Sequence, residues 1–380
     1  MKKKVYFSNL DGLRFLAFLA VFFAHSFWTE YDSIKQNAWY SVVKEVTYKG
    51  VAGVNFFFVL SGFLITYLLL QESYNSGKIN ISSFYMRRIL KIWPLYYIVV
   101  LVGFVLVPFV QSFIGQPSPE KSHLFYFLFF IGNFDVLPTS AVLGVLWSIA
   151  VEEQFYFVWP LIFAALHKKY YKYIFPVIIA ISIPIQLLPY SKQGSLLWSS
   201  PFVCMGDLAI GGWAAYGVFN SSRFRELILG LSRPFIVVVY AAGILFLLFM
   251  YQLNNISVFF SAFSRTILCV FFAFIILEQN YAKNSFYKVS NFRNISKLGL
   301  YTYSLYMTHM MCIYVINKIF DVLNLNTEVY QVVFLQTLIS FIASIIVGWL
   351  SYLVIEKRFL SLKKRFDSRS LKAELETAAS

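Results

Sequence analysis

Long apolar stretches alternate with short polar segments along almost the whole chain. Each of ten such stretches has about the length that an α-helix needs to cross the hydrocarbon core of a bilayer, roughly 20 residues. The predicted spans are residues 10–28, 50–72, 88–110, 144–166, 173–190, 197–219, 233–251, 258–278, 297–318 and 330–355. Unpaired backbone amides are costly in hydrocarbon, and the pattern contains no run of alternating strands of about ten residues. The chain is therefore predicted to be an all-α, polytopic membrane helical bundle.

A shorter apolar run at residues 124–133 is ambiguous by length. If it does not cross, the loops on one side hold 24 of the 32 Lys and Arg residues and those on the other side hold six, with Arg14 and Arg265 inside spans. Loops rich in Lys and Arg face the cytoplasm, so both termini are expected there. An eleventh span would move every later loop to the opposite side of the membrane and remove this asymmetry. Residues 124–133 are therefore predicted to be a candidate re-entrant segment and not a full span.

One membrane-embedded domain is expected over residues 1–360, followed by a short basic-to-polar cytoplasmic tail at 361–380. The start of the chain has the charge of a signal peptide, but the apolar stretch behind it contains Asp11, Arg14 and His25 and lacks a small-residue cleavage site. This stretch is therefore expected to remain as the first helix.

The composition indicates that lipid surrounds most of the chain, and together with the net charge and the cysteine spacing it argues against nucleic-acid binding and a metal site. Of the 380 residues, 59% are hydrophobic and only 13% are charged, against about 25% charged in a soluble domain. A net charge of +14 could indicate nucleic-acid binding, but the cations lie at the ends of the spans, where they set orientation. No nucleic acid is expected as a partner. Cys204, Cys269 and Cys312 lack the spacing of a disulfide framework or a zinc site, so no metal is expected.

Ionisable side chains inside a bilayer are costly unless they face protein, water or a ligand, so they are the first candidates for function. The first span carries Asp11, Arg14 and His25. Eleven residues at about 100° each end about 20° beyond three turns, so Arg14 and His25 share one helix face, about 16 Å apart, with Asp11 beside Arg14. The structural alternative is an ion pair between Asp11 and Arg14 at the helix end and an interfacial hydrogen bond at His25.

The fourth span carries two adjacent carboxylates, Glu152 and Glu153, which are not expected to face lipid. Ser148, Glu152 and Tyr156 lie on one stripe of the helix, while Glu153 points about 100° away. At most one of the two glutamates should therefore belong to a given pocket. By topology, Glu152 and His25 both lie in the outer half of the membrane. The structural alternative, a hydrogen-bonded glutamate that ties helices together, suits Glu153 better than Glu152.

Two further spans carry small or isolated polar residues near mid-depth. Ser61 and Gly62 lie in the second span, where small residues usually indicate close helix packing, and this interpretation is favoured for Gly62. Tyr306 and His309 lie in the ninth span. A lone histidine at such a position more often forms a hydrogen bond between two helices than acts as a catalytic group.

A basic cluster, Arg87, Arg88 and Lys91, marks the cytoplasmic edge of the third span. Anchoring at the membrane surface explains part of it. Either arginine shares one side of a helix with Lys91, and the guanidinium fork suits phosphate oxygens. The cluster is therefore also a candidate binding site for a phosphate-containing ligand.

Four segments resemble the acyltransferase-3 family of membrane O-acyltransferases, in the same order and over essentially the whole chain. They are Leu10-Asp11-Gly12-Leu13-Arg14 followed by His25, Phe58-Val59-Leu60-Ser61-Gly62-Phe63, Arg87-Arg88 with Ile92 and Pro94, and Trp147-Ser148 running into Glu152-Glu153-Gln154-Phe155-Tyr156. The resemblance implies an acyltransferase that moves an acetyl or other short acyl group from cytoplasmic acyl-CoA, with acetyl-CoA favoured, to a hydroxyl of a cell-envelope saccharide or lipid-linked glycan. It also places the protein in the cytoplasmic membrane.

The resemblance also implies roles for individual residues. It assigns catalysis to His25, Glu152 and Arg14, and donor binding to Arg87, Arg88 and Lys91. The other polar residues of the spans are candidates for supporting or substrate-binding roles: Asp11, Ser61, Glu153, Tyr306 and His309. Position 91 is often Arg in relatives, and Lys keeps the charge without the bidentate fork. His25 could take the proton of the attacking hydroxyl or attack the thioester itself, and the residues do not choose between these routes.

Two other classes of protein are compatible with the pattern. A secondary transporter would also place charges around a midplane site, but it predicts an internal repeat, and we detect none in the sequence. A non-catalytic envelope scaffold would need neither Arg14 nor His25.

Many members of the family add an extracytoplasmic esterase-like domain after the last span, and no such domain is expected in residues 1–380. The group that selects the acceptor is therefore expected to lie in the membrane domain or in an extracytoplasmic partner protein.

Overall fold

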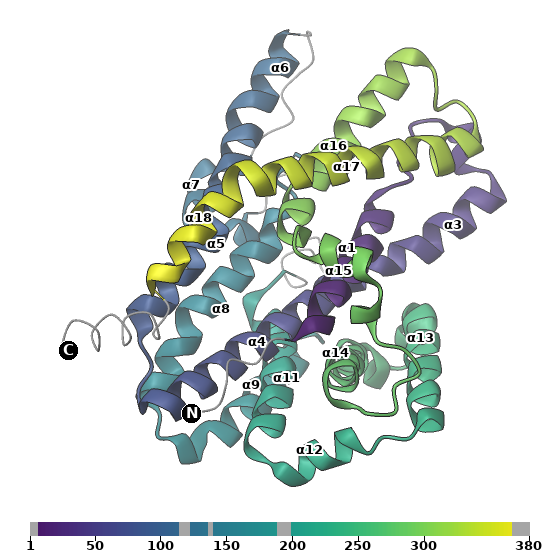
Figure 1. The fold of residues 1–380 in the computed structure, drawn as a ribbon. Helices are drawn as coiled ribbons and strands as arrows, with labels where there is room; N and C mark the ends of the chain where they lie inside the picture. The colour runs from purple at the N-terminus through teal and green to yellow at the C-terminus, as the bar shows by residue number, and fades with distance from the viewer. Residues whose placement is uncertain (1–6, 114–121, 136–139, 188–198, 367–380) are drawn as a thin grey trace. The chain divides into compact units, whose positions relative to one another are not determined.

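The computed structural model describes residues 7–113, 122–135, 140–187 and 199–366 (Figure 1). Within these ranges all regular secondary structure is helical, and no strand occurs. The predicted all-α class is therefore confirmed. The chain divides into two compact units: unit 1 contains Met1–Phe27, Lys35–Gly77 and Phe163–Leu300, and unit 2 contains Trp28–Ile34, Lys78–Ile162 and Tyr301–Ser380.

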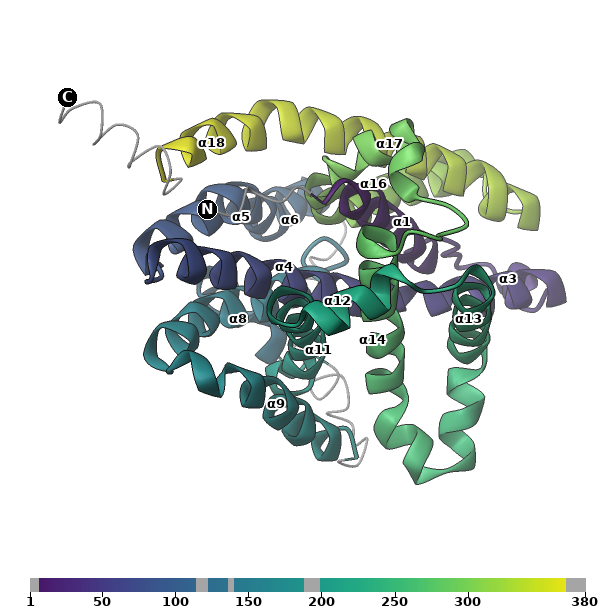
Figure 2. The same cartoon turned by 60° about the horizontal axis from the view of Figure 1, so that its bottom comes forward.

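Unit 1 is organised around the packing of α4 against α11 and α1. Its helices are α1 (Ser8–His25), α3 (Ala38–Tyr48), α4 (Ala52–Ser76), α9 (Tyr171–Ile185), α11 (Pro201–Asn220), α12 (Ser222–Leu229), α13 (Arg233–Ile256), α14 (Val258–Tyr281) and α15 (Arg293–Gly299). Helices α13 and α14 lie side by side (Figure 2).

Two glycines allow α4 and α11 to pack closely. A Cβ at Gly62 would lie 1.9 Å from the Leu208 carbonyl oxygen, and a Cβ at Gly211 would lie 1.8 Å from the Val59 carbonyl oxygen. Close packing at Gly62, between α4 and α11, is therefore confirmed.

Unit 2 contains several long helices that change from α to π geometry without breaking. Its main helices are α5 (Ile81–Leu101), which continues through Val102–Leu106 into α6 (Val107–Phe113), α7 (Leu124–Leu128), most of α8 (Leu146–Ala165), α16 (Thr302–Leu323), α17 (Thr337–Ser351) and α18 (Lys357–Leu362). A π-helical segment at Gln331–Gln336 precedes α17 and another at Tyr352–Glu356 follows it. Helices α16 and α17 lie side by side (Figure 1).

The ambiguous run at 124–133 forms a hairpin and not a span. Helix α7 has five residues and therefore rises only about 7.5 Å, far less than the roughly 30 Å of a bilayer core. After a turn, a short 3-10 helix, Gly132–Phe134, leads back to Asp135. The Asp135 carboxylate accepts a hydrogen bond of 2.8 Å from the His123 backbone N–H, so the two ends of the segment lie together. We call residues 123–135 the α7 hairpin.

Cysteines at the two ends of the α7 hairpin are expected to be accessible from the same side of the membrane. His123→Cys and Phe134→Cys replace exposed side chains, and the three native cysteines are buried, so background labelling should be low. Both variants should react with a membrane-impermeant thiol reagent added to the outside of intact cells. Opposite accessibility of the two positions would show that this segment crosses the membrane.

Six helical runs are long and apolar enough to cross a membrane among the residues described: Ala38–Ser76, Ile81–Ser112, Pro201–Asn220, Arg233–Ile256, Val258–Tyr281 and Gln331–Leu362. The protein is a multi-pass membrane protein. The other four predicted spans fall on α1, α8, α9 and α16. Helix α9 has only 15 residues, and the other three carry the ionisable side chains that made them candidates for function. The predicted tail lies outside the described residues from 367 onward.

Candidate functional site

The charged start of α1 contains an ion pair within one helical turn. Arg14 Nη1 lies 2.7 Å from Asp11 Oδ1, and the Asp11 side chain is largely buried whereas that of Arg14 is partly exposed. Asn9 fixes this end of the helix, because its amide donates to the Gln279 carbonyl at 2.8 Å and its oxygen accepts from the Ser290 N–H at 2.9 Å. The ion pair that the sequence offered as the structural alternative is thus formed, and Asn9 anchors the end of the helix that carries it.

His25 is the last residue of α1, and the helix is continuous from Ser8. Its imidazole therefore lies on the helix face of Arg14, about 16 Å further along the axis. The backbone that follows is constrained: Phe27 adopts a left-handed conformation with φ of 58°, and its carbonyl accepts a hydrogen bond from the Tyr40 hydroxyl of α3. Such strained positions persist only where the surroundings fix them, and they cluster at functional sites. His25 belongs to unit 1 and Glu152 to unit 2, so their sharing of one site stays a prediction.

Three successive residues of α8 point in three directions and bind three different partners. The Tyr156 hydroxyl donates to Glu152 Oε2 at 2.9 Å, one helical turn away along the predicted stripe. The Trp93 indole N–H donates to Glu153 Oε2 at 2.8 Å, while Glu153 Oε1 is buried without a hydrogen-bond partner in the described part of the chain. Gln154 binds the α7 hairpin. Its amide donates to the Phe130 carbonyl at 2.8 Å and to Asn133 Oδ1 at 2.7 Å.

The basic residues of α5 separate onto two sides of that helix. Arg87 Nη1 donates to the Phe366 carbonyl at 2.8 Å, and Lys91 interacts electrostatically with Glu356, so both face the C-terminal segments. The Arg88 guanidinium instead lies over the Tyr156 ring of α8, 5.0 Å from its centroid. Of the two pairings considered from the sequence, Arg87 with Lys91 is therefore the one that shares a side.

Tyr306 and His309 are buried in α16 and are held by local contacts. The Tyr306 hydroxyl lies 2.7 Å from Ser148 Oγ of α8, and His309 Nδ1 lies 2.7 Å from the Tyr306 carbonyl oxygen. A contact between a ring nitrogen and a carbonyl of the same helix fixes the orientation of the imidazole. Ser61, on α4, is half-buried next to the tightly packed Gly62.

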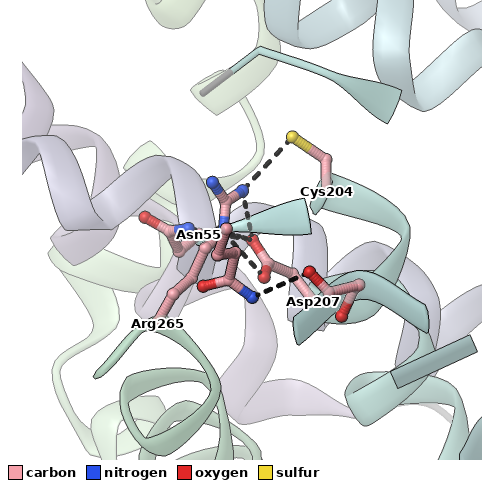
Figure 3. A network of polar contacts seen from close by, with 6 residues as sticks. Asn55, Cys204, Asp207 and Arg265 are labelled. Atoms are coloured by element: carbon pink, nitrogen blue, oxygen red, sulfur yellow. Dashed lines mark hydrogen bonds and ion pairs between the residues drawn. The ribbon is translucent and has the colours of Figure 1, made fainter. Parts of the chain in front are cut away.

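A buried ionic network in unit 1 was not identified from the sequence (Figure 3). Arg265 of α14 donates from Nε and Nη2 to the Asp207 carboxylate of α11, with the shortest contact 2.7 Å, and both side chains are at most 5% exposed. Asn55 of α4 donates to Asp207 Oδ2 at 2.8 Å, and Cys204 Sγ lies 3.2 Å from Arg265 Nη2. The network therefore joins three helices inside one unit.

Comparisons with known proteins agree with the resemblance noted in the sequence. A family model described as an acyltransferase domain matches residues 7–353. A protein of Staphylococcus aureus strain COL, whose name assigns it provisionally to the O-acetyltransferases, is 31% identical over 211 residues, which are 51% of this chain and 31% of the relative. The O-acetyltransferase OatA of S. aureus strain NCTC 8325 is 33% identical over 173 residues, 43% of this chain and 26% of that protein. No solved structure matches the chain significantly.

The family match includes the helices that carry every candidate residue named above. The chain belongs to the acyltransferase-3 family of membrane acyltransferases. It aligns with about a third or less of the length of these two relatives.

Proposed function

We propose that this protein is a membrane O-acyltransferase that transfers an acyl group, with acetyl favoured, from cytoplasmic acyl-CoA to a hydroxyl of a cell-envelope saccharide or lipid-linked glycan. The observation that carries the proposal is the family match over residues 7–353, which includes Arg14, His25 and Glu152 in the expected order. The names of the S. aureus relatives support an O-acetyl transfer. A cell-envelope acceptor agrees with a multi-pass membrane protein.

The donor is proposed to enter from the cytoplasm over the basic residues of α5. Arg87 and Lys91 share one side of that helix and supply two fixed cations for the phosphates of coenzyme A, with Arg88 on the adjoining side. The start of α5 and both chain termini are proposed to lie on the cytoplasmic face of the cytoplasmic membrane, and the distribution of loop cations supports this orientation.

The chemistry is proposed to centre on His25. The acceptor hydroxyl attacks the thioester carbonyl, its proton passes to the imidazole, and the coenzyme A thiolate leaves and is protonated to the thiol. In the two-step alternative the imidazole attacks first and carries the acyl group before the hydroxyl accepts it. Arg14 is proposed to stabilise negative charge along the donor path, and Glu152 to orient the imidazole or the hydroxyl.

The experiment that tests this function follows both products of the transfer. Purified protein in lipid nanodiscs receives acetyl-CoA labelled in the acetyl group, together with fractionated envelope glycans. We expect release of free coenzyme A thiol that depends on one glycan fraction, and the label in that fraction by mass spectrometry. Release without any acceptor measures background hydrolysis. If no fraction stimulates release or takes up label, the proposed reaction is wrong.

A further inference from the structure

Arg88, Tyr156 and Glu152 form one connected unit between α5 and α8. The Tyr156 hydroxyl donates to Glu152 Oε2 at 2.9 Å, and the Arg88 guanidinium carbon lies 5.0 Å from the centroid of the same tyrosine ring. Tyr156 is buried, with 5% of its surface exposed. The tyrosine therefore contacts a candidate catalytic carboxylate with its hydroxyl and a cation with its ring.

The surroundings of Arg88 differ from those of its two basic neighbours. Its guanidinium also lies 5.6 Å from the centroid of the Phe84 ring and interacts electrostatically with Glu152 and Glu153. Arg87 and Lys91 face the C-terminal segments instead. The Arg88 guanidinium therefore lies against two aromatic rings and within electrostatic range of two carboxylates of its own unit.

The arrangement has a direct chemical consequence for Glu152. A cation over the face of a phenol is attracted to the electron density of the ring and draws it away from the hydroxyl, which then becomes a stronger hydrogen-bond donor. The donor and the carboxylate are one helical turn apart on the same helix, so the bond fixes the carboxylate in one rotamer without movement of another element. Glu152 is thereby held in place before any substrate binds.

We propose that Tyr156 is a positioning residue for Glu152 and that Arg88 acts with it, through the tyrosine ring. The inference rests on the proposed function, because it takes Glu152 as part of the acyl-transfer site. It gives one member of the basic cluster a second role: Arg87, Arg88 and Lys91 remain the candidates for donor binding, and Arg88 also acts at the carboxylate site.

Steady-state kinetics of conservative variants test the proposed roles of Tyr156 and Arg88. Tyr156→Phe keeps the ring under Arg88 and removes only the hydroxyl, so kcat should fall about tenfold or more while KM for acyl-CoA stays within about twofold. Arg88→Gln should lower kcat to a similar extent. Arg87→Gln is the matched comparison one residue away, and it should raise KM for acyl-CoA with a smaller effect on kcat. Melting temperature and size-exclusion profile establish that each variant is folded.

A double-mutant cycle separates positioning from a general structural role. In a Glu152→Gln background, followed with radiolabelled donor, Tyr156→Phe should cost less than about a further twofold, because the group it positions is already altered. Additive losses, an unchanged kcat in Tyr156→Phe, or an effect of Arg88→Gln on donor KM alone would overturn the inference while leaving the proposed function intact. A parent protein that transfers no acyl group would overturn both.

Discussion

Asp207→Asn is expected to destabilise the protein by roughly 3–5 kcal/mol, the cost of removing one partner of a buried ion pair. The substitution leaves the Arg265 guanidinium charged and buried at 5% exposure, with an amide in place of the carboxylate that accepts three of its hydrogen bonds. It also changes the acceptor of the Asn55 amide, so all three helices of the network lose a contact. Thermal unfolding of the purified protein in detergent, followed by circular dichroism, measures the effect.

A control is available in the ion pair between Lys318 and Asp321, in which Nζ and Oδ2 are 3.8 Å apart and the lysine side chain is 38% exposed. Lys318→Gln should change the stability by less than about 1 kcal/mol, because an exposed charge gains little from such a pair over its hydration. It also leaves the hydrogen bond from the Asn326 amide to Asp321 in place. The double variant Asp207→Asn with Arg265→Gln should recover part of the lost stability, since no uncompensated charge remains. If Asp207→Asn has the same melting temperature as Lys318→Gln, the network does not hold the three helices together.

The sequence predicted the parts of this structure that depend on neighbours along the chain. The all-α class follows from the cost of unpaired amides in hydrocarbon, and the prediction that residues 124–133 are not a full span follows from the distribution of Lys and Arg among the loops. Contacts within one helix could also be predicted. Asp11 and Arg14 are three residues apart, Glu152 and Tyr156 are four apart, and both contacts follow from helical geometry alone.

Contacts between helices could not be predicted from the sequence in the same way. Trp93 with Glu153, and Asn9 with Gln279, depend on how side chains from distant segments meet, and helical periodicity says nothing about that. The Asp207–Arg265 pair did leave a signal: Asp207 is the one charged residue inside the predicted span 197–219, and Arg265 is the one charged residue inside 258–278 apart from Glu278 at the end of that span. Because a single charge in a span needs a partner, the isolated acid and the isolated base are natural candidates to pair with each other.

The number of crossings shows a different limit. Six helical runs in the described part of the chain satisfy length and hydropathy together, while α1, α8 and α16 contain the residues assigned to function. Polar side chains that a membrane enzyme needs for chemistry lower the mean hydropathy of the helices that carry them. Spans near a site are therefore harder to detect by composition than spans that only face lipid.

His25→Gln is expected to reduce acyl transfer by about a hundredfold or more, the usual contribution of a general acid or base, while folding and donor binding are retained. Three observations support a chemical role: the imidazole lies on the helix face of Arg14, the backbone after it is held in a left-handed conformation at Phe27, and the family match includes both residues. Glutamine keeps hydrogen-bonding groups of similar reach but cannot accept the hydroxyl proton or carry the acyl group. Turnover with labelled acyl-CoA and acceptor measures the loss, and equilibrium binding of acyl-CoA measures donor affinity.

His309→Gln is the matched control, because the same change is made at a buried histidine whose Nδ1 already contacts the Tyr306 carbonyl. It should lower turnover far less than His25→Gln, since a glutamine can replace an orienting hydrogen bond but not a base or a nucleophile. Rapid acid quench during turnover then separates the two routes at His25: label trapped on the peptide containing His25 favours the acyl-imidazole, and its absence favours direct transfer. If His25→Gln turns over at nearly the parental rate, the chemistry does not take place at the end of α1, and the assignment of the active site to that helix is wrong.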